Sequence, residues 1–561
     1  MSLTDSVVYQ IYPKSFRDST GDGVGDLRGI IEKVDYIASL GVDHVWFNPF
    51  FPSPGRDNGY DISDYCAIDP TMGTMEDFEN LVAALGERGI GVMLDMVLNH
   101  VSTDHEWFQR ALAGDPEYQD YFYLLPPKED GSLPTNWVSK FGGPAWAPFG
   151  DTGLYYLCLY DRTQADLNWH NLAVRAQAAR VVNFWRSKGV KDFRFDVINV
   201  IGKTLPLEDA PAGTDDRYMY TDGPLVHDYL RELSAASFGQ DPDAMTVGEM
   251  SSTTVEACVG YSNPANGELS MVFSFHHLKV DYANGAKWTR VPYDFAALKR
   301  ILNEWALGMQ AGGGWNALFW NNHDQPRAID RFADPVNYHV ESATMLATVI
   351  HLLRGTPYIY MGEEIGMTDP AFRSIEDYVD IEARNAYKEL TAGGMEPQEA
   401  FAVVHSKARD NARTPMQWNA EVPGAGFTTG TPWLRPTNQG TVNVEREEAQ
   451  GRILPYYRRL IALRQELPVI SRGAYAPYLL EHEDVLAYIR EHEGNRLLVL
   501  CNFSSHDAEV PVPEDFIAAR ILIGNYDGND SSRSPGELPA ADRLEEGALR
   551  LRPYEAIALL A

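Results

Sequence analysis

The order of apolar patterns along this chain of 561 residues constrains its fold most strongly. Short β-rich runs alternate with stretches whose apolar residues recur at the spacing of one helix face. The first such stretch extends from Leu27 to Leu40 and stops at Gly41, and Thr74 with Asp77 three residues later is typical of a helix start. Eight strand-like runs occur, at residues 7–12, 42–47, 92–97, 193–197, 245–247, 272–275, 317–320 and 357–360. Eight strands that alternate with helices predict an α/β protein with a (β/α)₈ TIM barrel.

Two regions fall outside this alternation. Residues 101–165, after the third strand, are rich in Pro, Gly, Trp and Tyr, and this aromatic content favours an inserted domain over a disordered insertion. Beyond residue 470 the helical patterns give way to alternating runs such as 496–502 and 549–560, which predict a small antiparallel β domain. We therefore expect a barrel at 1–100 and 166–470, an inserted domain at 101–165 and a C-terminal β domain at 471–561.

Composition argues against several classes of partner. The chain carries 47 Lys and Arg against 79 Asp and Glu, a net charge of −32, so it would repel nucleic acid and anionic membranes. We find no run of eighteen apolar residues and no basic start followed by an apolar segment, so we expect neither a membrane span nor a signal peptide. Four widely spaced cysteines without a CxxC pair argue against a zinc site or a disulfide framework. They favour a reducing cytoplasm, where we expect a monomer or a weak homodimer.

Four acidic residues stand at the carboxyl ends of predicted strands: Asp95, Asp196, Glu249 and Asp324. In a barrel these ends share one rim, so the four side chains should meet. Arg194 lies two residues before Asp196, on the same side of its strand, where it can hold that carboxylate ionised. By itself an Arg-x-Asp pair is more often an ordinary salt bridge. Carboxylates gathered without metal-binding histidines point to an acid and a nucleophile that act on a glycosidic bond.

These residues lie in motifs that resemble those of glycoside hydrolase family thirteen, the α-amylase superfamily: residues 95–100, 192–197, 247–249 and 322–325. The resemblance covers nearly the whole chain and implies a catalytic barrel, an inserted B domain and a C-terminal β-sandwich. It implies that Asp196 is the nucleophile, Glu249 the general acid/base and Asp324 the carboxylate that stabilises the distorted sugar, with no cofactor for catalysis. Three further residues match positions that bind the transition state: Arg194, His100 and His323. For the two histidines, a structural role in the core is the alternative.

The turn at residues 57–61 follows the second strand and resembles the family's glucose-binding turn. By this resemblance Tyr60 stacks beneath the sugar at subsite −1, and Asp61 with Arg409 holds the 4-hydroxyl of a non-reducing end. A plain surface turn is the alternative for Asn58-Gly59. Arg409 belongs to a long segment, 408–418, that is typical of exo-acting glucosidases, which close the pocket behind the terminal sugar.

A glycine-rich loop near the N-terminus offers an oxygen donor at every second residue: Asp18, Thr20, Asp22, Val24 through its carbonyl, and Asp26. Such alternation can wrap a hard cation. The loop resembles the calcium loop of the oligo-1,6-glucosidase branch, so we expect Ca²⁺ as a structural ion. An acidic loop without a cation is the alternative.

The residue after the proposed nucleophile narrows the range of possible substrates. Val197 is the residue seen in relatives that cleave α-1,6 or trehalose-type bonds, whereas α-1,4-specific relatives carry threonine. The segments 248–254, 275–288 and 310–316 resemble those of family members that hydrolyse trehalose 6-phosphate. Lys279 and Lys287 fall where the leaving-group sugar should bind, and in a chain of net charge −32 they are candidate phosphate ligands. Solvated surface lysines are the alternative.

We therefore predict a retaining α-glucosidase that hydrolyses a small phosphorylated disaccharide, trehalose 6-phosphate, to glucose and glucose 6-phosphate. The enzymatic alternatives are an oligo-1,6-glucosidase that acts on isomaltose or dextran ends and a transglucosidase that isomerises disaccharides. A non-catalytic carbohydrate-binding protein is a third alternative, and retention of all three proposed catalytic carboxylates argues against it. Two departures from the family pattern, Asn48 and Asp192, are expected to affect loop geometry and no catalytic group.

Overall fold

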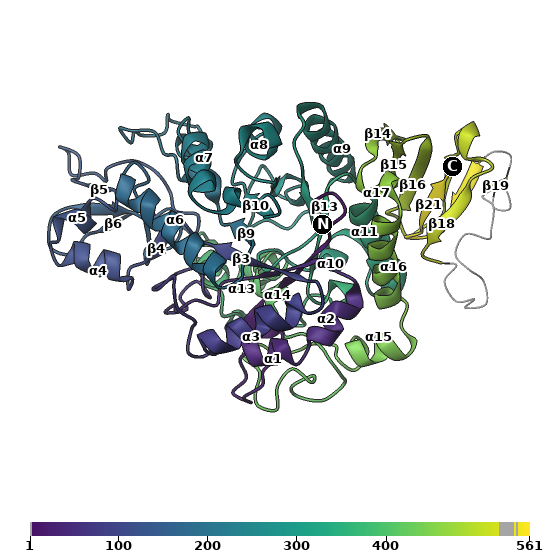
Figure 1. Ribbon diagram of the computed structural model, residues 1–561, viewed down its shortest axis with the longest axis horizontal. Coiled ribbons are helices and arrows are strands. Elements are labelled where there is room, and N and C mark those ends of the chain that lie inside the picture. Colours follow the sequence, from purple (N-terminus) through teal and green to yellow (C-terminus); the bar gives the residue numbers. More distant parts are fainter. Residues whose placement is uncertain (1–2, 527–543, 546–547) are drawn as a thin grey trace.

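The computed structural model describes residues 3–526, 544–545 and 548–561, and a barrel of eight parallel strands forms its centre (Figure 1). The strands are β1 (Val8–Ile11), β2 (His44–Phe47), β3 (Gly91–Met96), β9 (Asp192–Phe195), β10 (Thr246–Glu249), β11 (Met271–Phe273), β12 (Ala317–Leu318) and β13 (Thr356–Tyr360). Hydrogen-bonded neighbours follow the order β11-β10-β9-β3-β2-β1-β13-β12. A parallel bridge between Val272 and Asn316 brings the two ends of this order together. The predicted (β/α)₈ barrel is confirmed.

Large side chains from separate strands fill the barrel. The Tyr358 hydroxyl of β13 lies 3.4 Å from the Met271 sulfur of β11 and 3.9 Å from the Met93 sulfur of β3. Trp46 of β2 packs edge-on against Tyr358, with ring centroids 6.0 Å apart. All four side chains are buried. Because the interior is packed, functional groups are expected beyond the strand ends.

Helices surround this barrel. They are α1 (Leu27–Ile31), α2 (Val34–Leu40), α3 (Met75–Gly86), α6 (Leu172–Ser187), α7 (Val226–Ala236), α8 (Val255–Ser262), α9 (Phe295–Gly312), α10 (Ala328–Phe332), α11 (His339–Leu352), α12 (Ile381–Ala392), α13 (Pro397–His405), α14 (Asp410–Arg413), α15 (Val444–Gln450), α16 (Ile453–Glu466) and α17 (Pro468–Ser471). The prediction of a single helix from Leu27 to Leu40 is wrong, because the helical conformation is interrupted at Lys33. The ammonium of Lys33 lies 4.2 Å from the ring centroid of Trp418. The start at Thr74 is confirmed, because Thr74 and Asp77 form a reciprocal capping box.

The chain between β3 and α6 builds a small subdomain. It holds α4 (Glu106–Leu112), α5 (Pro116–Gln119), a sheet of β4 (His100–Ser102) with β8 (Gln164–Asp166), and a sheet of β5 (Leu124–Leu125), β7 (Tyr155–Leu157) and β6 (Trp146–Pro148). Its apolar cluster includes Trp137 and Trp146 and also takes in Val197 and Tyr220 from the segment after β9. The inserted subdomain therefore packs against the loops that border the barrel rim.

Two antiparallel sheets form the C-terminal part, as predicted. One holds β14 (Ala474–Tyr478), β15 (Val485–His492), β16 (Asn495–Asn502), β21 (Ala556–Leu560) and β18 (Arg520–Gly524), and the other β17 (Ala508–Pro511), β20 (Ala548–Leu551) and β19 (Leu544–Glu545). Leu498 and Leu500 of the first sheet share a core with Val510 and Leu551 of the second. Residues 527–543 and 546–547 of the predicted domain lie outside the described residues. Figure 1 shows this part and the inserted subdomain at opposite ends of the molecule.

Two further features of the described chain concern its helices and its cysteines. No helix in the described part of the chain has both the length and the apolarity that a membrane span needs. The four cysteines are free thiols, and of these only Cys66 is exposed.

Candidate active site

Arg194 holds three carboxylates at the carboxyl ends of adjacent strands. Its Nη1 donates to Asp95 Oδ1 and to Asp196 Oδ1, both at 2.6 Å, and its Nη2 contacts Glu249 Oε2. The strand order explains this geometry, because β9 lies between β3 and β10, and Arg194 stands opposite Asp95 on one side and Val247 on the other. The guanidinium is fully buried, so these carboxylates compensate its charge where water cannot.

The surroundings of Glu249 favour its protonated form. Burial raises the pKa of Glu249 well above its ordinary value; Arg194 opposes this shift, and the charges of Asp196 and Asp324 reinforce it. Burial likewise raises the pKa of Asp95 to about 7, against the influence of Arg194. A protonated Glu249 beside a carboxylate that accepts a charge-assisted hydrogen bond from Arg194 is the pairing that an acid and a nucleophile require.

Val197, directly after Asp196, has an unusual backbone. Its φ is 39°, in the left-handed region that β-branched residues rarely adopt. Its N–H lies 3.4 Å from Glu249 Oε2, and its side chain packs in the same apolar cluster as Trp137 and Tyr220. Strain of this kind persists only where packing imposes it, and it is common at functional sites.

Asp324 joins the site from the loop after β12. Arg413 Nη2 donates to its Oδ1 at 2.8 Å, Arg409 Nη1 lies 3.4 Å from the same oxygen, and His323 Nε2 lies 3.3 Å from Oδ2. Burial would raise the pKa of Asp324, but His323, Arg409 and Arg413 hold the pKa well below its ordinary value. Asp324 is therefore an anion held ready for hydroxyl donors.

Nε2 of His323 makes no hydrogen bond within the described chain, although Asp324 Oδ2 lies 3.3 Å from it. Gln10 Nε2 and Asn48 Nδ2 lie 3.0 and 3.1 Å from His323 Nδ1, and because both are amide donors, the ring proton resides on Nε2. Burial lowers the pKa of His323 to about 3, so the ring is neutral. The expectation that Asn48 affects only loop geometry is wrong, since its Nδ2 also donates to the Tyr60 hydroxyl at 2.7 Å.

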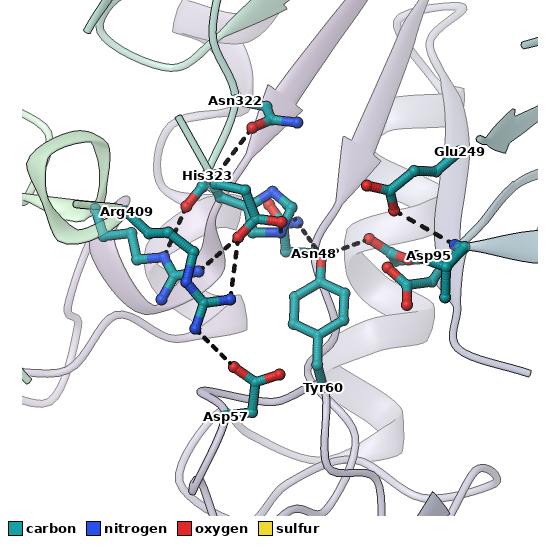
Figure 2. A network of polar contacts seen from close by, with 12 residues as sticks. Asn48, Asp57, Tyr60, Asp95, Glu249, Asn322, His323 and Arg409 are labelled. Atoms are coloured by element: carbon teal, nitrogen blue, oxygen red, sulfur yellow. Dashed lines mark hydrogen bonds and ion pairs between the residues drawn. The ribbon is translucent and has the colours of Figure 1, made fainter. Parts of the chain in front are cut away.

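Tyr60 lies between the carboxylates around Arg194 and the charged residues around Arg409. Its hydroxyl donates to Asp95 Oδ2 at 2.8 Å, and its ring stacks on His323 with centroids 5.1 Å apart. Figure 2 shows Arg409 on one side of Tyr60, and Glu249 with Asp95 on the other. A sugar in contact with Tyr60 would lie between Arg409 on one side and Glu249 with Asp95 on the other.

The predicted pairing of Asp61 with Arg409 is wrong. Asp61 is fully buried, and its carboxylate accepts hydrogen bonds from the Ser53 hydroxyl and from the N–H groups of Arg56 and Asp57. Asp57 instead reaches Arg409, with 3.0 Å between Oδ1 and Nη2 (Figure 2). The first aspartate of the turn faces the site, because donors inside the turn already occupy the last one.

His100 lies at the site, but both of its ring nitrogens have protein partners. Nδ1 accepts from the Asn99 side-chain amide at 3.2 Å, and Nε2 donates to the Tyr60 carbonyl, also at 3.2 Å. Burial lowers the pKa of His100, which favours the neutral ring. In this structure His100 holds the backbone of Tyr60 in place.

Lys279 and Lys287 differ in their partners. Lys287 Nζ donates to both carboxylate oxygens of Glu382 on α12, at 2.8 and 2.7 Å, and Glu382 Oε2 lies 3.4 Å from Arg409 Nε. The ammonium of Lys287 is therefore already paired within the fold, and its predicted phosphate role stays a prediction. Lys279 is half-buried, and its ammonium has no hydrogen bond or ion pair with any residue that the structure describes, although Arg217 and Asp215 lie close enough to affect its pKa.

The carboxylates of the predicted cation loop bind the loop's own backbone. Asp18 accepts hydrogen bonds from three N–H groups, those of Thr20, Gly21 and Gly23. Asp22 accepts from the Val24 N–H, and Asp26 accepts from the Gly29 N–H at the start of α1. Within the described ranges, no three acidic, His or Cys side chains come together as metal ligands. These hydrogen bonds occupy carboxylate oxygens among the predicted ligands, and the structural ion stays a prediction.

Carboxylates arranged in this way around one guanidinium, at the rim of a (β/α)₈ barrel, are those of a glycoside hydrolase. Residues 10–473 match the α-amylase catalytic domain, and residues 485–558 match the C-terminal domain of the α-amylase SusG. The chain belongs to the α-amylase family, glycoside hydrolase family thirteen.

Similar proteins within this family cover the whole chain. A trehalose-6-phosphate hydrolase of Bacillus subtilis is 48% identical over 98% of this chain and 97% of its own length. An oligo-1,6-glucosidase of Halalkalibacterium halodurans is 43% identical, again over 98% and 97%. The crystal structure of Bacillus licheniformis trehalose-6-phosphate hydrolase aligns with a TM-score of 0.92 and 47% identity, covering 100% of this chain and 99% of that one.

Proposed function

We propose that this protein is a retaining α-glucosidase that hydrolyses trehalose 6-phosphate to glucose and glucose 6-phosphate. The observation that carries the proposal is Lys279, a half-buried ammonium that forms no ion pair with a described residue, although Asp215 lies close enough to raise its pKa. It follows β11, the strand paired with β10, which ends in Glu249. A phosphate on the leaving sugar would supply the missing negative charge. The relative from Bacillus subtilis supports the same substrate.

The chemistry follows from two carboxyl groups on one guanidinium. Asp196 attacks the anomeric carbon of the terminal glucose while Glu249 donates its proton to the glycosidic oxygen, which releases glucose 6-phosphate and leaves a glucosyl ester on Asp196. Glu249 then takes a proton from water, which displaces Asp196 and releases glucose. The raised pKa of Glu249 keeps its proton available at neutral pH, and Arg194 holds both groups in place.

The groups around Arg409 suit a terminal sugar. Arg409 contacts both Asp57 and Asp324, and its guanidinium lies 4.9 Å from the ring centroid of Phe141 in the inserted subdomain. Carboxylate oxygens and Nε2 of His323 offer hydrogen bonds to sugar hydroxyls. We infer that this side of the site binds a non-reducing end and that the enzyme releases one glucose at each turnover.

An oligo-1,6-glucosidase is the second candidate, and the relative from Halalkalibacterium halodurans favours it. It would use Asp196 and Glu249 in the same way on isomaltose, but an uncharged leaving sugar would give Lys279 no partner. A disaccharide-isomerising transglucosidase shares the first step and differs only in that the released sugar, rather than water, attacks the glucosyl enzyme.

Product analysis separates these activities. We expect equimolar glucose and glucose 6-phosphate from trehalose 6-phosphate, with a kcat/KM above that for isomaltose. Preferential cleavage of isomaltose would establish the oligo-1,6-glucosidase instead. Formation of isomeric disaccharides from sucrose at a comparable rate would establish the transglucosidase.

The proposal includes a cytoplasmic location and a monomeric or weakly dimeric state. The four free thiols suit a reducing compartment. Light scattering across a range of protein concentrations tests the assembly, and a stable higher oligomer would contradict it.

A further inference from the structure

We propose that Lys140 and Arg217 join Lys279 to form the site that binds the phosphate of the leaving sugar, an inference that rests on the proposed function. The three residues come from different parts of the chain. Lys140 belongs to the inserted subdomain, Arg217 to the segment between β9 and α7, and Lys279 to the loop after β11. We call these three residues the basic cluster.

The loop of Lys140 contacts the segment of Arg217, because the Val138 N–H donates to Asp216 Oδ2 at 2.7 Å and Lys140 Nζ lies 5.3 Å from the ring centroid of Tyr220. Burial, followed by the positive charges of Arg217 and Lys279, lowers the pKa of Lys140 to about 7, against the opposing influence of Asp215 and Asp216. Burial and then Arg217 lower the pKa of Lys279 as well, and Asp215 only partly opposes this shift. Mutual repulsion between cations is unusual in a protein of net charge −32, and a bound anion would relieve it.

Each member has a donor to spare. Lys140 Nζ donates to the Ser251 hydroxyl at 2.9 Å and has no ion pair with a described residue. Arg217 directs Nε and Nη2 to Asp215, and its Nη1 has no acceptor within the described chain. Because Asp215 neutralises Arg217, the excess positive charge comes from Lys140 and Lys279. The free donors suit the three terminal oxygens of a phosphate ester.

Ser251 ties the basic cluster to the reacting groups. It lies two residues after Glu249, and Asn199 fixes its backbone through two hydrogen bonds of 2.8 Å. Phe141, next to Lys140 in the chain, lies against the guanidinium of Arg409. The basic cluster therefore borders the bond to be cleaved. A disaccharide whose terminal glucose meets Arg409 would place its second sugar near Lys140.

Substitution of the cations tests this assignment. We would measure kcat/KM for trehalose 6-phosphate and for p-nitrophenyl α-glucoside in Lys140→Met, Lys140→Arg and Arg217→Gln. Lys128→Met is the matched control, because Lys128 belongs to the same subdomain but pairs with Asp209 at the surface. Inhibition of aryl glucoside hydrolysis by glucose 6-phosphate gives a second measurement, and thermal unfolding checks that each variant is folded.

In Lys140→Met and Arg217→Gln we expect the ratio of kcat/KM for trehalose 6-phosphate to kcat/KM for p-nitrophenyl α-glucoside to fall about ten- to hundred-fold. Loss of one charge-assisted contact implies a change of this size. The inhibition constant of glucose 6-phosphate should rise by a similar factor, Lys140→Arg should recover part of the loss, and Lys128→Met should match wild type. An unchanged ratio in folded Lys140→Met and Arg217→Gln would overturn the assignment. If wild type prefers isomaltose, the proposed function fails, while inhibition by glucose 6-phosphate still decides whether the basic cluster binds phosphate.

Discussion

Asp57 and Arg409 form an ion pair of 3.0 Å between Oδ1 and Nη2, although 352 residues separate them in the chain. Asp57 lies in the turn after β2, and Arg409 precedes α14. The same guanidinium reaches Asp324 and Asp380, so loops after three barrel strands converge on it. This convergence makes one side of the site rigid and charged, as recognition of a terminal sugar requires.

The nucleophile is the first group to test. Asp196→Asn removes the attacking oxygen anion and keeps the shape of the side chain. We expect activity on an aryl glucoside to fall by several orders of magnitude, because covalent catalysis and its electrostatic support disappear together. The unfolding temperature should stay near that of wild type. Turnover at close to the wild-type rate would exclude Asp196 as the nucleophile.

The pH profile tests Glu249. A general acid must be protonated, so kcat/KM should decline as pH rises through the pKa of Glu249, which burial places above its ordinary value. Glu249→Gln should abolish this alkaline limb. It should also slow disaccharide cleavage far more than cleavage of an aryl glucoside, whose leaving group needs little protonation. Persistence of the alkaline limb in the variant would assign it to another group.

Asp57 and Asp61 should differ in what they affect. Asp57→Asn leaves Arg409 paired with Asp380 and Asp324, so we expect little loss of stability. It should weaken sugar binding, with a fall in kcat/KM that corresponds to about 1.5–3 kcal/mol of lost transition-state stabilisation. Asp61→Asn leaves donors of the turn unsatisfied and should lower the unfolding temperature. The reverse outcome, in which Asp61→Asn weakens only catalysis, would restore the original assignment.

Lys279 and Lys287 form a matched pair for kinetics. Lys279→Met should reduce kcat/KM for trehalose 6-phosphate much more than for unphosphorylated substrates, because it removes an unpaired cation from the proposed phosphate-binding site. Lys287→Met breaks the contact with Glu382 and should reduce activity on phosphorylated and unphosphorylated substrates alike. Equal behaviour of the two variants would contradict this division.

Calcium binding by the N-terminal loop is tested by stability. A ligand that binds only the folded state raises its unfolding temperature. Calcium should therefore raise the unfolding temperature of wild type and not that of Asp22→Ala. The Asp22 side chain, which is exposed in wild type, is one of the predicted ligands. The same response in both proteins would remove the loop as the calcium site.

Periodicity predicted the barrel well, because each of its eight strands carries a compact apolar run between helical stretches. Asp196 and Glu249 could be placed by the same reasoning, since strand ends define one rim. The assignment of Asp61 failed because Asp57 and Asp61 share one turn, and only the three-dimensional contacts show which carboxylate the turn itself uses. No local pattern distinguishes two such residues.

Residues from irregular segments were harder to find. The ion pair of Lys287 could not be foreseen, because its partner Glu382 lies 95 residues further on, in a helix whose position the sequence does not specify. Lys140 and Arg217 occupy loops without periodicity, and their shared location depends on how the inserted subdomain packs against the barrel. Asn48 was judged peripheral because its contacts with Tyr60 and His323 join segments far apart in the chain.

The most direct test of the account compares trehalose 6-phosphate with trehalose. The two substrates share the same glycosidic bond and differ only in the phosphate, so the ratio of their kcat/KM values isolates recognition of that group. We predict a ratio of about one hundred or more, as expected when a phosphate gains more than one charge-assisted contact, and a decline of the ratio with rising salt. A ratio near one, unaffected by salt, would contradict the proposal that this enzyme recognises a phosphorylated disaccharide.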